Sequence, residues 1–132
     1  MSLLAAYGAM LILFLGLDAL WLRLAMKPFF ERRVGALLAP RPRLGVAAGF
    51  YLLYVAGILY FAAAPALREA AWSAALLKGA LFGFFAYGTY EATNLATLKG
   101  WRWSLLAVDL AWGTALTAAA ALAGFLAGRC FG

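Results

Sequence analysis

The chain has 132 residues, of which 67% are hydrophobic and 12% charged, with a net charge of +6. A soluble domain of this length has too little interior to bury so much apolar surface, so the composition predicts an integral membrane protein whose main partner is lipid. Basic loops that face anionic lipid headgroups account for the positive charge without nucleic acid. With no histidine and one cysteine, Cys130, we expect no metal site, cofactor or intramolecular disulfide.

Four apolar stretches are predicted to form transmembrane helices of a single domain. They cover residues 3–24, 44–64, 75–98 and 104–127, and each supplies the roughly 20 residues that a spanning helix needs. The first stretch lacks the basic start and the Ala-x-Ala cleavage site of a signal peptide, so we expect it to be retained. The predicted fold is therefore an all-α bundle of four transmembrane helices, residues 1–132.

A short amphipathic helix is predicted at residues 28–38, between the first two spans. Pro28 suits a helix start, apolar residues follow at helical spacing, and Arg32 and Arg33 lie between them. Such a segment lies at the membrane interface. The simpler interpretation is a membrane anchor, and the alternative is a lid over a cavity that faces the cytoplasm.

Basic residues indicate the orientation of the bundle. Eight of the eleven lie in the first and third connections: Arg23, Lys27, Arg32, Arg33, Arg41, Arg43, Lys99 and Arg102. The opposite side carries Arg68, Lys78 and Arg129. Because cytoplasmic loops are enriched in lysine and arginine, we expect both termini to face away from the cytoplasm.

Glycine pairs spaced four residues apart indicate close helix packing. The pairs are Gly45 with Gly49, Gly79 with Gly83, and Gly124 with Gly128. This spacing lets two helix backbones approach closely in lipid. The contact can form within one chain, in a homodimer, or in a larger membrane-protein complex.

Three of the five acidic residues fall inside predicted spans: Asp18, Glu91 and Asp109. An ionisable group in the hydrocarbon region costs about 2.5–3.5 kcal/mol on insertion scales, so it requires a partner or a function. At 1.5 Å per residue, all three are predicted to lie roughly 8–12 Å inside the cytoplasmic boundary. The sequence therefore predicts one layer of carboxyl groups inside the membrane.

Aromatic and polar residues are expected to surround this acidic layer, because they recur at helical spacing around the acids. The predicted ligand- or proton-binding set is Asp18, Trp21, Tyr54, Tyr87, Glu91, Asn94, Asp109 and Trp112. Carboxylates beside aromatic rings can attract a cation, share protons, or bind a polar headgroup.

A purely structural interpretation is the alternative to this site. The acids can pair with Arg23, Lys99 or Arg102 reaching inward, or accept hydrogen bonds from tryptophan and tyrosine that hold the helices in register. Trp101 and Trp103 are expected to belong to the aromatic belt at the membrane interface. We favour a functional pocket, because three acids in one layer exceed what helix register needs.

Much of the chain resembles a bacterial family of small predicted inner-membrane proteins whose function is unassigned. The resemblance is carried by the string Tyr51-Leu-Leu-Tyr54 in the second span, by Thr93-Asn94-Leu95-Ala96-Thr97-Leu98 in the third, and by Asp109-Leu-Ala-Trp112-Gly113 in the fourth. It implies four helices and a bacterial inner membrane. The family typically has aspartate where this chain has Glu91, and this tolerance of one extra methylene argues against rigid metal coordination.

Three functions remain open from the sequence. We favour an intramembrane acidic and aromatic site that binds a proton, cation or small polar ligand, with transport as its use. The alternative is a non-catalytic accessory or assembly subunit of a larger membrane complex. An enzyme acting on lipid or isoprenoid substrates is the least favoured, because no diphosphate motif, nucleophile–base pair or cofactor fingerprint is present.

Overall fold

A computed structural model describes residues 3–21, 23 and 44–131, and all the elements in these residues are helical. The bounds are α1 (Leu3–Trp21), α3 (Leu44–Ile58), the π-helical turn η3 (Leu59–Ala63), α4 (Ala64–Glu69), α5 (Trp72–Thr97) and α6 (Trp103–Cys130). The all-α fold expected from the sequence is thus confirmed. The interfacial helix predicted at residues 28–38 lies outside the described residues.

α3, η3 and α4 follow one another without a break in helical backbone, and together they extend the second predicted stretch to Glu69. Pro65 lies in the first turn of α4, where its missing N–H group is tolerated better than in a helix interior, and the wider π-helical turn precedes it. The helix ends at Ala70, whose backbone is left-handed with φ 54°. That reversal directs the chain into α5.

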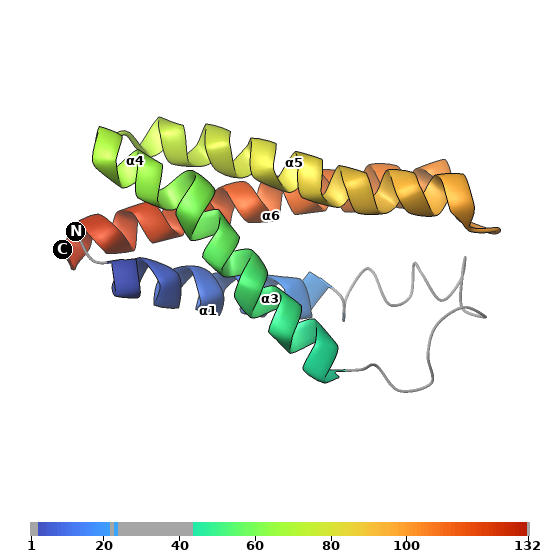
Figure 1. Ribbon diagram of the computed structural model, residues 1–132, viewed down its shortest axis with the longest axis horizontal. Helices are drawn as coiled ribbons and strands as arrows, with labels where there is room; N and C mark the ends of the chain where they lie inside the picture. The colour runs from blue at the N-terminus through green and yellow to red at the C-terminus, as the bar shows by residue number, and fades with distance from the viewer. Residues whose placement is uncertain (1–2, 22, 24–43, 132) are drawn as a thin grey trace.

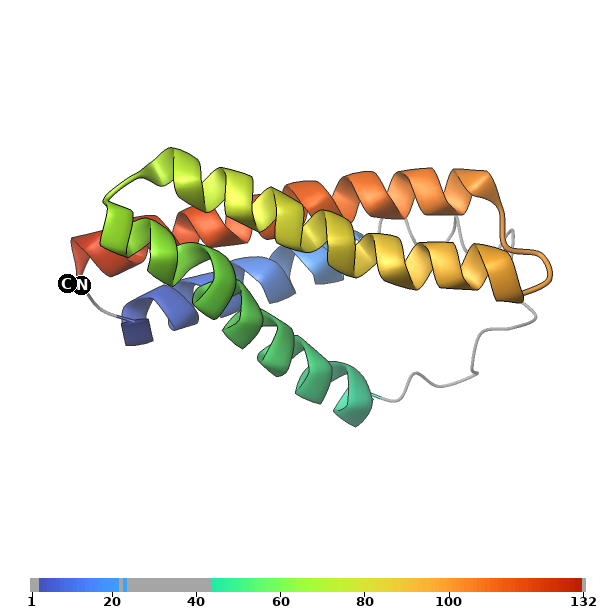
Figure 2. The same ribbon diagram turned by 45° about the horizontal axis from the view of Figure 1, so that its top comes forward.

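The helices form a bundle from which one helix, α3, diverges. α1, α5 and α6 run along the long axis, whereas α3 crosses obliquely and diverges from them toward its own start, as both views show (Figures 1 and 2). α6 packs against α5 along its length and against α1 on another side, while α3 has little contact with α6. The two termini lie at one end and the α5–α6 connection at the other (Figure 1).

Small residues bring α5 and α6 together. A Cβ on Gly79 would lie 2.7 Å from that of Ala121, and one on Gly83 would lie 2.6 Å from the backbone oxygen of Gly113. Contacts this short leave no room for a side chain, so the two backbones touch directly. Gly124 forms a similar close approach to Met10 of α1.

The other predicted packing glycines differ. A Cβ on Gly45 or Gly49 would meet no atom within 4 Å, because the start of α3 is spread away from the bundle. These two glycines therefore make no helix contact within the described part of one chain, and a contact with a second chain stays a prediction. Gly128 is buried near the end of α6.

Three segments of the described chain are long and apolar enough to cross a membrane: Leu3–Trp21, Ala48–Glu69 and Trp103–Cys130. They match the first, second and fourth predicted spans. α5 has 26 residues, enough to cross, but Lys78, Glu91 and Asn94 make it more polar. The crossing of the membrane by α5 stays a prediction.

Candidate functional site

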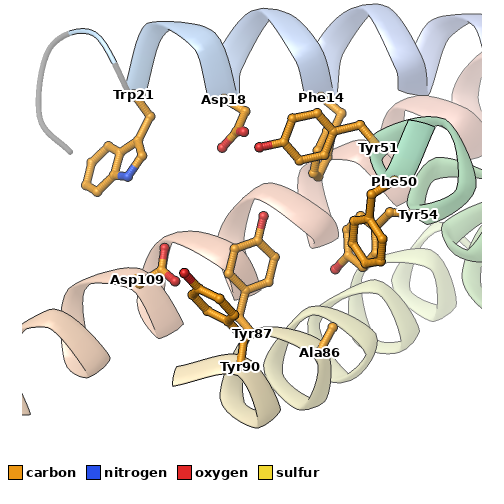
Figure 3. A pocket seen from close by; sticks show the side chains of 10 residues that line it. All are labelled: Phe14, Asp18, Trp21, Phe50, Tyr51, Tyr54, Ala86, Tyr87, Tyr90 and Asp109. Atoms are coloured by element: carbon orange, nitrogen blue, oxygen red, sulfur yellow. The ribbon is translucent and has the colours of Figure 1, made fainter. Parts of the chain in front are cut away.

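A cavity of about 320 Å³ lies between α1, α3, α5 and α6, where α3 diverges from the bundle. All four helices contribute to its wall (Figure 3). The lining residues are Phe14, Asp18, Trp21, Phe50, Tyr51, Tyr54, Ala86, Tyr87, Tyr90 and Asp109. The wall thus combines two carboxyl groups with aromatic rings, four of which carry hydroxyl groups.

Asp18 and Asp109 approach the cavity from different helices, and their carboxyl groups point into it (Figure 3). Their side chains are nearly buried, with exposed fractions of 6% and 9%. Asp18 lies one turn before the end of α1, and Asp109 lies less than two turns after the start of α6. Both are near the end of the bundle that holds the α5–α6 connection, so the structure brings two of the three predicted acids to one cavity.

The Asp18 carboxylate is held by neighbours from two other helices. The indole Nε1–H of Trp112 donates a hydrogen bond of 3.4 Å to its Oδ1, and the Tyr51 hydroxyl group points at it and makes a second hydrogen bond (Figure 3). Trp112 is stacked on Trp21, with ring centroids 4.4 Å apart and an interplanar angle of 7°. Asp18 therefore links α1, α3 and α6. Trp112 supports the site from outside the cavity wall.

Asp109 has a different environment. Its closest interaction is with another acid, Glu91, with which its side chain makes a hydrogen bond, and no salt bridge joins it to a basic side chain within the described residues. Two neighbouring carboxyl groups that are nearly buried are costly in their ionised forms unless a shared proton or a cation compensates their charge. Asp18 has hydrogen-bond donors from Trp112 and Tyr51, so Asp109, paired with an acid, is the lining carboxyl group that a bound cation would stabilise more.

Glu91 is fully buried and lies behind the cavity wall. Its Oε1 accepts a hydrogen bond of 3.0 Å from the indole Nε1–H of Trp101, whereas its Oε2 has no hydrogen-bond partner among the described residues. The sequence suggested that Trp101 belongs to an interfacial aromatic belt. Its indole also holds the carboxyl group of Glu91. Its indole follows the turn after α5 and folds back onto that helix.

Asn94, also predicted to bind ligand, does not line the cavity. It lies one helical turn after Tyr90, and its side chain hydrogen-bonds to that residue. Because Tyr90 lines the cavity, Asn94 orients a wall residue from behind. Tyr54 is oriented in the same way by a hydrogen bond of 2.8 Å between its hydroxyl group and that of Thr117.

Ion pairing does not account for the acids in the described part of the chain. The salt bridge found there joins Lys78 to Glu69 at 3.5 Å, near the α4–α5 connection at the opposite end of the bundle. Within the described residues, support for a purely structural role of the acids therefore comes from hydrogen bonds, such as those of Asp18 and Glu91. No group of three or more His, Cys, Asp or Glu side chains within the described residues could hold a metal ion.

Several lining residues lie outside the binding set that was predicted from the sequence. Tyr51 and Tyr90 lie three residues from the predicted Tyr54 and Tyr87, and Phe14 lies four residues before Asp18. Helical spacing was the signal that could have identified these three. Phe50 carried no comparable signal, because its position depends on the divergence of α3.

Gly113 has a role that the spacing of glycine pairs did not reveal. A Cβ at this position would collide with the ring of Tyr87. Glycine in α6 thus provides the space in which a cavity-lining tyrosine lies. This contact fixes the ring of Tyr87 against α6 and leaves its hydroxyl group directed into the cavity (Figure 3).

Together these features define the class of protein. Long apolar helices with internal carboxylates are typical of α-helical membrane proteins, and carboxylates beside aromatic faces favour a positively charged ligand. The chain belongs to the family described as predicted membrane protein (DUF2177), whose model matches residues 3–126. The family membership expected from the sequence is thereby confirmed. No curated protein and no solved structure matches the chain.

Proposed function

We propose that this protein binds a small organic cation in the cavity between Asp18 and Asp109, as the binding step of a transporter. The observation that carries this proposal is the pair of nearly buried carboxyl groups pointing into one aromatic cavity without a basic partner in the described residues. Tyrosine and tryptophan rings attract a cation through their negative faces, and the carboxylates supply opposite charge. A cavity of about 320 Å³ is within the size range of small-molecule sites.

The proposed orientation places the cavity in the cytoplasmic half of a bacterial inner membrane. α1, the α3–α4 helix, α5 and α6 would then cross the bilayer four times, with both termini outside the cytoplasm. Support comes from three basic residues next to the helix ends nearest Asp18 and Asp109: Arg23 follows α1, and Lys99 and Arg102 lie in the α5–α6 connection. Lipids surround the apolar outer face.

Binding of tetramethylammonium to purified protein in nanodiscs, measured by isothermal titration calorimetry, tests the site. We expect saturable binding with one ion per chain, and we expect glycerol, a neutral solute of similar size, not to bind. Absence of saturable binding would contradict the proposal. Stoichiometric co-purification of larger membrane subunits from native membranes would favour the accessory role instead.

Cys130 provides a test of orientation, because it is the single cysteine and is exposed at the end of α6. We expect a membrane-impermeant maleimide to label it in intact spheroplasts. The matched control is Ser104→Cys in a Cys130→Ser background, since Ser104 is exposed at the opposite end of the same helix. That variant should react only after permeabilisation, and the reverse pattern would overturn the orientation.

A further inference from the structure

We propose that the ligand is an amphipathic cation, with an ammonium headgroup in the cavity and an alkyl chain that leaves between α3 and α5 into the lipid. This inference rests on the proposed cation site and adds the chemical class of the ligand and its route. The structural basis is the position of the cavity mouth, which the exposure of the lining residues identifies.

The lining residues divide into a floor and a rim. Phe14, Asp18, Tyr54 and Asp109 are buried and form the floor. Phe50 of α3 and Tyr90 of α5 are exposed by 61% and 56%, although both also line the cavity. Side chains that are both lining and exposed mark an opening, so the mouth lies between α3 and α5.

The packing of the helices leaves this opening on the lipid-facing side. The backbone of α5 approaches the second helical segment mainly at η3 and α4, and toward the end of α3 the ring of Tyr54 contacts Phe82 and Tyr87 of α5. The start of α3 diverges from α5 in both views (Figures 1 and 2). Its outer residues are apolar and exposed, including Val46 and Leu53, and such a surface suits contact with acyl chains rather than water.

Charge and polarity follow the same division. Both carboxyl groups of the cavity lie on its floor, whereas Phe50 and the neighbouring Leu53 provide an apolar path outward. An amphipathic cation in one leaflet has the same arrangement, because its headgroup lies at the interface and its chain in the hydrocarbon. A ligand of this class would enter sideways from the bilayer with its charge moving toward Asp109.

The test uses a hexadecyltrimethylammonium probe with a diazirine at the middle of its chain, incorporated into nanodiscs with the full chain. An extended hexadecyl chain is too large to be enclosed with its headgroup in a cavity of about 320 Å³, so most of the chain must lie outside it. After irradiation and trypsin digestion, we expect labelling that excess tetramethylammonium suppresses at least fivefold. That competed label should lie on the peptides of residues 44–68 and 79–99, which carry α3 and most of α5.

The probe also labels the outer helix faces through general contact with lipid. The decisive quantity is therefore the part of the labelling that tetramethylammonium suppresses. It should be lost in Asp109→Asn and unchanged in Glu69→Gln, an exposed acid at the other end of the bundle. If tetramethylammonium binds but suppresses no label on these two peptides, the amphipathic ligand is excluded and the cation site stands. If neither compound binds, the proposed function itself fails.

An ammonium headgroup with an alkyl chain can come from an aminolipid of the bilayer or from a free lipophilic amine. Nanodiscs made from phosphatidylglycerol alone, or with added phosphatidylethanolamine, distinguish the two sources. Competition by the aminolipid would weaken tetramethylammonium binding and support the lipid source. Unchanged binding, with the competed label still present, would support a free amine.

Discussion

Asp109→Asn is expected to weaken tetramethylammonium binding about 10- to 100-fold. The substitution keeps the size and shape of the side chain but removes its charge, and an interaction with a charged group contributes about 1.5–3 kcal/mol. Asp109 has the largest expected effect among the lining residues, because it points into the cavity and its closest neighbour is another acid, Glu91, rather than a basic group. Calorimetric titration of the variant in nanodiscs measures the change directly.

Two control variants separate loss of charge from loss of structure. Asp109→Glu keeps the charge and should retain more binding than the asparagine variant. Glu69→Gln removes an exposed acid paired with Lys78 at the other end of the bundle, and its binding should equal that of the unmodified chain. Equal affinity of Asp109→Asn and the unmodified protein, with circular dichroism showing both folded, would refute the assigned role of Asp109.

Gly83→Leu is expected to lower the free energy of unfolding by about 1–3 kcal/mol, the usual cost of overpacking. Any Cβ at this position meets the backbone oxygen of Gly113 at 2.6 Å and the Cβ of Thr117 at 2.7 Å. Backbone atoms cannot move aside as the end of a flexible side chain can, so α5 and α6 must separate. Unfolding of detergent-solubilised protein by increasing sodium dodecyl sulfate provides the measurement.

Gly49→Leu is the matched control for Gly83→Leu. Both glycines belong to pairs that the sequence predicts to pack, yet a Cβ on Gly49 meets no atom within 4 Å. We expect its free energy of unfolding to change by less than about 0.5 kcal/mol, as for most surface substitutions. Equal destabilisation by both variants would show that the α5–α6 contact is not the cause, and would indicate a contact of α3 with a second chain.

The helices, and the grouping of Asp18 with Asp109, were predictable from local properties of the chain. Runs of apolar residues predicted the helical elements, since α1, α5 and α6 begin and end within a few residues of the expected bounds. Counting 1.5 Å per residue from the basic ends predicted that Asp18 and Asp109 share one layer. The structure places them accordingly on the two sides of one cavity.

The residues that contact the acids could not be predicted from the sequence, because those contacts depend on how the helices cross. Helical periodicity fixes the height and the face of a residue, but it fixes neither the order of helices around the bundle nor the angle between them. Glu91 illustrates the limit, because it shares the predicted layer yet lies behind the wall, bonded to Trp101.

The sequence by itself therefore determined an all-α membrane protein and its family, and it predicted that Asp18 and Asp109 lie at one level of the bundle. Only the tertiary structure decided that α3 diverges from α5 and leaves a mouth between Phe50 and Tyr90. The physical reason is that hydrophobic patterning is local, whereas a cavity arises where packing is incomplete. Contacts between distant segments, such as Gly83 against Gly113, bring α5 and α6 together, and no such contact holds the start of α3.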